Sequence, residues 1–134
     1  MTIEWKPELA LGHAQIDADH RELFRRTDAL VEALTRGERS EVALLFEFLQ
    51  EYVVRHFGEE ERLMRESAFG GARVHEAAHA RFVRELAELR ALFDQAGATP
   101  GIAVRTSTWV VDWLERHIAG VDQAFAAHLR ARAG

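Results

Sequence analysis

The chain of 134 residues contains no cysteine, which excludes disulfides, thiolate metal sites, iron–sulfur clusters and cysteine nucleophiles together. Any metal that it binds must therefore be held by nitrogen and oxygen atoms. It also has no apolar run of about 18 residues, the length that a membrane-spanning helix needs. Its Lys and Arg residues form no cluster and the net charge is −5, so a nucleic-acid partner is not expected.

The N-terminus, MTIEWKPELALGH, lacks a basic segment followed by an apolar one, so no secretory signal is predicted. We therefore expect a cytoplasmic protein without a membrane span. A chain of this length can bury a core without disulfides and suits one domain, which we expect to extend over residues 1–134.

The sequence has only two prolines, Pro7 and Pro100, and both lie outside the strongly periodic segments. Apolar residues recur at helical spacing in four segments, and no strand-like alternation is present. The predicted helices cover residues 16–36, 40–67, 72–96 and 102–131. Their short connections predict an all-α, antiparallel up-down-up-down four-helix bundle. Residues 1–15 are predicted to form an extended arm that packs Ile3 and Trp5 against the bundle.

Ionisable side chains continue the apolar stripes of all four predicted helices. In the second helix, Val42, Leu49 and His56 recur at intervals of seven, and Glu60 follows one turn after His56. The full set is His20, His56, Glu60, His75, His79, His117 and Asp122. Buried carboxylates without partners cost several kcal/mol, and no Lys or Arg lies on the same stripes. A metal site inside one end of the bundle would satisfy the whole set.

Seven ligands are too many for one tetrahedral zinc ion. Two octahedral metals that share both carboxylates and one oxygen would use all seven and leave one position open for a small ligand. Iron, zinc, copper and manganese all accept such nitrogen and oxygen donors. One spacing is irregular, because His117 and Asp122 would lie about 140° apart on an ideal helix. We predict a local distortion there, which Gly120 would permit.

The stretch HEAAH, residues 75–79, fits the H-E-x-x-H pattern of zinc proteases, in which Glu76 would be the general base. That interpretation leaves the other buried ligands without a purpose, and we expect Glu76 on the surface. A ferritin-like di-iron oxidase is a second alternative, since Glu76 and His79 also form E-x-x-H. That class needs the motif twice and further glutamates, which the chain does not supply.

Four stretches occur in the order IDADHRELF, HFGEEERLM, HEAAHARF and WLERHIAGVD. With these motifs the chain closely resembles bacterial hemerythrins over essentially its whole length. The resemblance implies a four-helix bundle around a non-haem di-iron centre that binds dioxygen reversibly. The implied cofactor is a pair of iron ions (Fe2+/Fe3+) with an oxo or hydroxo bridge.

The resemblance also implies a role for each ligand. One iron would be held by His75, His79 and His117, the other by His20 and His56, with Glu60 and Asp122 as bridges. The open position would lie on the iron with two histidines. Residues next to the ligands are expected to form the oxygen pocket, namely Leu23, Phe57, Trp113 and Leu114. His13 and His128 match no ligand position and are expected on the surface.

The predicted function is that of an oxygen carrier, store or delivery protein, and not of an enzyme. The alternative is a di-iron enzyme or sensor that acts on oxygen, peroxide or nitric oxide, or that handles iron. A sensor normally needs an output domain, for which 134 residues leave no room.

Overall fold

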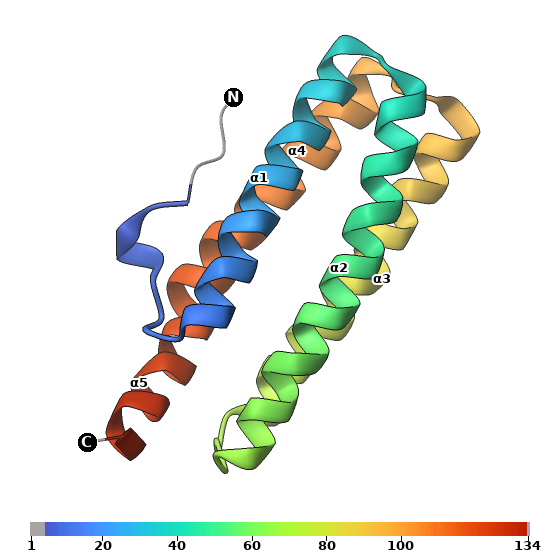
Figure 1. Ribbon diagram of the computed structural model, residues 1–134. Coiled ribbons are helices and arrows are strands. Elements are labelled where there is room, and N and C mark those ends of the chain that lie inside the picture. Colours follow the sequence, from blue (N-terminus) through green and yellow to red (C-terminus); the bar gives the residue numbers. More distant parts are fainter. Residues whose placement is uncertain (1–4, 134) are drawn as a thin grey trace.

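The computed structural model describes residues 5–133 of the chain. These residues form helices and no strand (Figure 1). The helices are α1 (Ala14–Arg36), α2 (Arg39–Glu66), α3 (Ala72–Ala96), α4 (Pro100–Arg116) and α5 (Asp122–Ala133). A 3-10 turn, η1 (Pro7–Leu9), precedes α1, and a π-helical segment, η2 (His117–Val121), joins α4 to α5. Among the described residues, no helix combines the length and apolarity needed to cross a bilayer.

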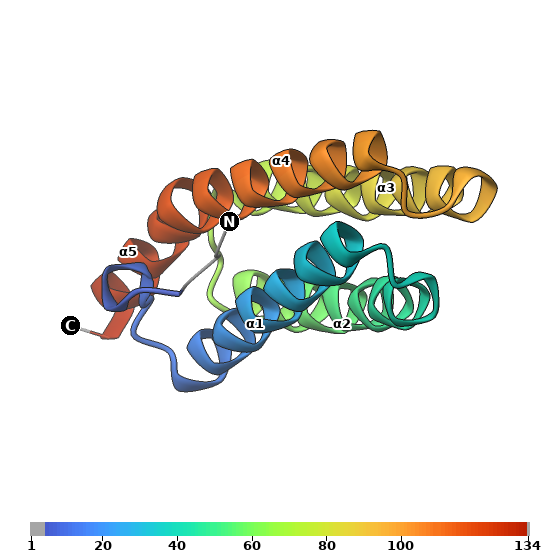
Figure 2. The same ribbon diagram turned by 90° about the horizontal axis from the view of Figure 1, so that it is seen from above.

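The first four α-helices run alternately up and down the bundle. Helix α1 packs against both α2 and α4, and α3 packs against α2 and α4, which closes the ring of four. Figure 2 shows α1 and α2 on one side of the bundle and α3 and α4 on the other. The predicted antiparallel four-helix bundle is confirmed. Fully buried side chains fill its middle, among them Leu30, Phe46, Leu86 and Phe93.

Local capping explains where several helices begin and end. Helix α1 begins at Ala14, two residues before the predicted start, because the side chain of His13 accepts a hydrogen bond from the backbone of Ile16 at 3.3 Å. Gly37 ends this helix with φ of 71°, a left-handed conformation that suits glycine. At α4, the Thr99 side chain caps the helix and Pro100 occupies its first turn.

The described residues before α1, residues 5–13, form the predicted arm, which lies beside the bundle (Figure 1). Trp5 packs against the core, and the guanidinium carbon of Arg21 lies 4.9 Å from the centre of its ring. Leu11 is buried in a small cluster with Phe125 and Met64. The arm therefore covers the end of the bundle where α5 begins. Ile3, the other residue expected to pack there, lies outside the described residues.

The predicted fourth helix is interrupted where the sequence indicated a distortion. At η2 the backbone N–H of Asp122 donates to the carbonyl of His117, five residues earlier, which defines a single π turn. Gly120 lies within this turn, and a Cβ atom there would meet nothing within 4 Å. The expected distortion is confirmed, and its extra residue turns Asp122 toward the same side as His117.

Candidate metal centre

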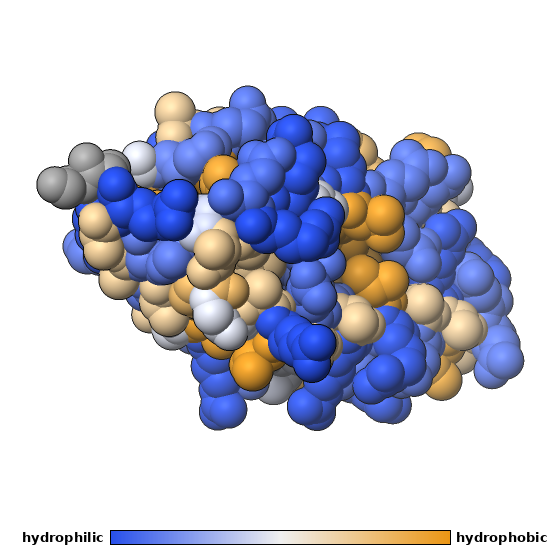
Figure 3. Space-filling view, turned by 90° about the horizontal axis from the view of Figure 1, so that it is seen from below, coloured by the Kyte–Doolittle hydropathy of each residue, from blue (hydrophilic) through white to orange (hydrophobic). Residues whose placement is uncertain are grey.

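The structure brings all seven predicted ligands together near one end of the bundle. Every one of them is at most 4% exposed. They come from the beginning of α1, the end of α2, the beginning of α3, the π turn and the beginning of α5. Figure 3, which views the molecule from the end where α1 and α3 begin, shows a largely hydrophilic surface with hydrophobic patches. The ligand cluster lies beneath this surface.

Glu60 lies between two groups of histidines. Its Oε1 atom is 2.7 Å from Nε2 of His75 and 3.6 Å from Nε2 of His79. Its Oε2 atom is 3.1 Å from Nε2 of His56 and 3.7 Å from Nε2 of His20. The two oxygens of one carboxylate therefore face two different groups, as a bridging ligand requires.

Asp122 has the same arrangement from the opposite side of the bundle. Its Oδ1 atom lies 2.7 Å from Nε2 of His75 and 3.0 Å from Nε2 of His117. Its Oδ2 atom lies 3.4 Å from Nε2 of His20. Both carboxylates thus divide the five histidines into a group of three and a group of two.

The donor atoms of the cluster fit a pair of metal ions. The facing nitrogen and oxygen atoms approach one another without forming aligned hydrogen bonds. Both oxygens of Glu60 and Asp122, and Nε2 of four of the five histidines, are buried without a hydrogen-bond partner. Two sets of atoms each lie within 4.8 Å of one another, namely Glu60, His75, His79, His117 and Asp122, and His20, His56 and Glu60. Imidazole and carboxylate donors suit iron and related metals.

Aromatic and aliphatic side chains surround the ligands. The ring of Phe57 stacks on His79, with ring centres 3.8 Å apart and planes 4° from parallel. Trp113 stacks on His117 in the same way, at 4.2 Å and 12°. The other two residues expected in the oxygen pocket, Leu23 and Leu114, are buried in the same hydrophobic cluster as Phe57. The surroundings of the site are therefore largely apolar.

Two carboxylates that the sequence analysis missed contact the far side of ligand rings. Asp19 Oδ2 lies 3.1 Å from Nδ1 of His56, and Glu61 Oε2 lies 3.3 Å from Nδ1 of His79. Each contact leaves Nε2 of the same ring facing the cluster. The only signal in the sequence is that each carboxylate directly adjoins a ligand, since Asp19 precedes His20 and Glu61 follows Glu60.

The remaining candidate residues lie outside the metal cluster. The side chain of Glu76 is 35% exposed and lies 3.6 Å from Arg65, so it is no buried general base. His13 and His128, which match no ligand position, are both half-buried at the surface and lie outside the cluster. His13 caps α1, and Nε2 of His128 lies 2.7 Å from the carbonyl oxygen of Ser67.

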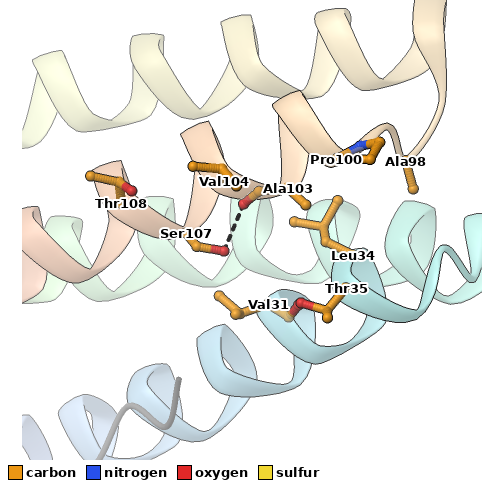
Figure 4. A pocket seen from close by; sticks show the side chains of 9 residues that line it. All are labelled: Val31, Leu34, Thr35, Ala98, Pro100, Ala103, Val104, Ser107 and Thr108. Atoms are coloured by element: carbon orange, nitrogen blue, oxygen red, sulfur yellow. Dashed lines mark hydrogen bonds between the residues drawn. The ribbon is translucent and has the colours of Figure 1, made fainter.

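A cavity of about 350 Å³ lies at the other end of the bundle, between the end of α1 and the beginning of α4 (Figure 4). No histidine or carboxylate lines it. The Ser107 hydroxyl donates to the carbonyl of Ala103 at 2.7 Å, and the Thr35 hydroxyl donates to the carbonyl of Val31 at 2.8 Å. These hydroxyls are already satisfied by their own helices, so the cavity offers no second metal site.

The ligands perturb one another in the metal-free protein. Burial alone would lower the pKa of His56, but the carboxylates of Asp19 and Glu60, which lie beside its two ring nitrogens, outweigh burial and raise that pKa to about 9. The pKa of His75 is also raised to about 9, because Asp122 and Glu60 outweigh its burial. Burial dominates at His79 and lowers its pKa to about 2. Protons on two histidines thus neutralise part of the carboxylate charge when metal is absent.

We expect the metal-free protein to lose stability as the pH rises from about 6.5 past about 9. The folded pKa values of His56 and His75 lie above the ordinary histidine value of 6.5, so the folded state binds more protons across this range. Their contribution is complete below about pH 6.5 and is lost as the pH passes about 9. Urea unfolding in the presence of a chelator, measured at several pH values, checks this. A free energy of unfolding that stays level or rises would contradict it.

The sequence and the fold of this chain match those of known proteins. Residues 11–129 match the family model described as "Hemerythrin HHE cation binding domain". A bacteriohemerythrin of Stenotrophomonas maltophilia is 33% identical over 127 residues, which cover 95% of this chain and 81% of that protein. A myohemerythrin of Riftia pachyptila is 28% identical, with 93% of this chain and 92% of that protein covered. A crystal structure of wild-type hemerythrin superimposes with a TM-score of 0.85 at 28% identity, covering 96% of this chain and 98% of that one.

Proposed function

Because this chain belongs to the hemerythrin family, whose members bind dioxygen at a non-haem di-iron centre, we propose that its seven buried ligands hold two iron ions for reversible oxygen binding. The observation that carries the proposal is the position of the two carboxylates. Glu60 and Asp122 each direct one oxygen toward the group of three histidines and the other toward the group of two.

The proposed ligand assignment follows the two groups of donor atoms. His75, His79 and His117 would hold one iron, His20 and His56 would hold the other, and Glu60 and Asp122 would contribute to both. The site of His20 and His56 offers one histidine fewer, so a metal held there would have room for a small ligand. When bound, the two ferrous ions supply the two electrons that reversible oxygen binding requires, one from each ion.

The apolar residues around the ligands are proposed to keep water and protons away from the open position. Leu23, Phe57 and Leu114 carry no polar side-chain atom and are at most 4% exposed. Trp113 covers the ring of His117. A wall formed by these four residues would exclude water and protons from the site and so favour reversible binding.

The chain is an oxygen-binding protein and not an enzyme, as its family membership indicates. We propose that it acts as an oxygen carrier, store or delivery protein, and that residues 1–134 form one hemerythrin-like domain. A cytoplasmic location and the lack of a nucleic-acid partner stay predictions.

The function is tested by reducing the iron-loaded protein without air, adding oxygen and then removing it. A charge-transfer band in the visible spectrum should develop with oxygen and vanish when oxygen is removed, over repeated cycles. Rapid conversion to a stable diferric protein would instead support an enzyme or sensor. Metal analysis that gives a single zinc ion per chain would contradict the proposed function altogether.

A further inference from the structure

Asp19 is held in one orientation by several neighbours. Its side chain is 6% exposed, and its Oδ1 atom accepts hydrogen bonds from the side chain of Gln15 at 2.9 Å and from the Tyr52 hydroxyl at 3.2 Å. The guanidinium of Arg55 lies 3.9 Å from the same oxygen. These contacts leave Oδ2 directed at Nδ1 of His56, at 3.1 Å.

The contact fixes both the protonation and the orientation of the His56 ring. An ionised carboxylate only accepts hydrogen bonds, so Nδ1 of His56 must carry the proton and donate it. The lone pair of the neutral ring then lies on Nε2, which faces Glu60 at 3.1 Å within the cluster. The negative charge behind the ring also makes Nε2 a stronger donor to a metal.

Glu61 offers a comparison on the other side of the cluster. It contacts Nδ1 of His79 at 3.3 Å, but its side chain is 25% exposed. Solvent screens such a contact more than it screens the buried contact of Asp19. The two groups of ligands therefore differ, since the group with only two histidines has the more deeply buried carboxylate behind one of them.

We propose that Asp19 is a positioning residue that holds His56 and strengthens metal binding selectively at the site formed by His20 and His56. That site has fewer protein nitrogen ligands than its neighbour, so the orientation and donor strength of each ring matter more there. Tyr52 supports the same function, because its hydroxyl lies 3.2 Å from the carboxylate and 3.0 Å from the backbone carbonyl of Asp19 and shares its one proton between them. The inference rests on the proposed di-iron assignment.

The test is a titration of the metal-free full-length protein with Co2+, followed by calorimetry and by the visible d–d bands of the bound metal. Asp19→Asn keeps the size of the side chain but removes its charge. It should lower the affinity for the weaker of two Co2+ ions by about 10- to 100-fold and leave the tighter ion within about threefold. The matched variant Glu61→Gln should have a smaller effect, and on the tighter ion.

Two further variants separate positioning from folding. Asp19→Glu keeps the charge and should recover part of the lost affinity, and Tyr52→Phe keeps Asp19 and should weaken the same ion less than Asp19→Asn does. An equal loss of affinity for both ions in Asp19→Asn would overturn this inference and leave the di-iron assignment intact. Unchanged affinity in both Asp19→Asn and Tyr52→Phe would have the same consequence. A wild-type protein that binds fewer than two Co2+ ions would overturn the di-iron assignment and this inference with it.

Discussion

Replacing Glu60 by alanine should remove both irons, so that the metal content of the purified protein falls from about two per chain to well below one. Both oxygens of Glu60 face histidines, His75 on one side and His56 on the other, so the substitution takes a ligand from each ion at once. After the substitution, Asp122 is the only one of the two facing carboxylates that remains between the two groups of histidines. Iron analysis together with the visible spectrum measures the loss.

The controls for this experiment lie on α2, which carries Glu60, and on the neighbouring helix α1. His56→Ala removes a ligand from one group only and should reduce the iron content by about half, and His20→Ala should do the same. Glu59→Ala removes an exposed carboxylate that pairs with Arg55 and should leave both irons in place. Retention of two irons in Glu60→Ala, His56→Ala and His20→Ala alike would contradict the proposed ligand set.

Removal of iron should destabilise the folded protein strongly. The cluster places both oxygens of Glu60 and Asp122 in the interior without hydrogen-bond partners, and metal binding compensates for their loss of hydration. Metal bound to the native state at about a thousand times its dissociation constant contributes about 4 kcal/mol to the free energy of unfolding. The melting temperature should therefore fall by roughly 10–20 °C after chelation, as measured by circular dichroism.

The Glu60→Ala variant also serves as the reference for this second experiment. Since it should hold little iron, a chelator should change its melting temperature by only about 1–2 °C. Readdition of ferrous iron without air should restore the melting temperature of the wild-type protein and not that of the variant. A melting temperature that is the same with and without chelator in the wild-type protein would contradict a stabilising metal pair.

Much of the fold and of the ligand set could be predicted from the sequence because both depend on helical spacing. The ligands lie on the buried stripes of their helices, so His56 follows Leu49 at the same interval at which Leu49 follows Val42. Antiparallel packing then brings the stripes of different helices to one height. The ends of the helices are predicted less accurately. His13, for example, caps α1 with its side chain, a contact that helical spacing does not indicate.

The supporting carboxylates could not be predicted because their function depends on distances between helices. Asp19 adjoins His20 and lies about 100° around α1 from it, which in isolation indicates a solvated position. Only the close approach of α2, with Tyr52 and His56 facing α1, buries the carboxylate and gives it partners. Glu61 likewise lies about 100° around α2 from Glu60, and its contact with His79 depends on the approach of α3.

The π turn between His117 and Asp122 acts as an insertion of one residue in the register of the last helix. Before the turn, the buried positions of α4 include Val110 and Leu114, four residues apart. After the turn, Asp122 is buried and Val121 only half-buried, although the seven-residue repeat from Leu114 would bury position 121. The turn absorbs this extra residue, so it places Asp122 in the cluster of candidate ligands and also determines which side of α5 packs against the arm.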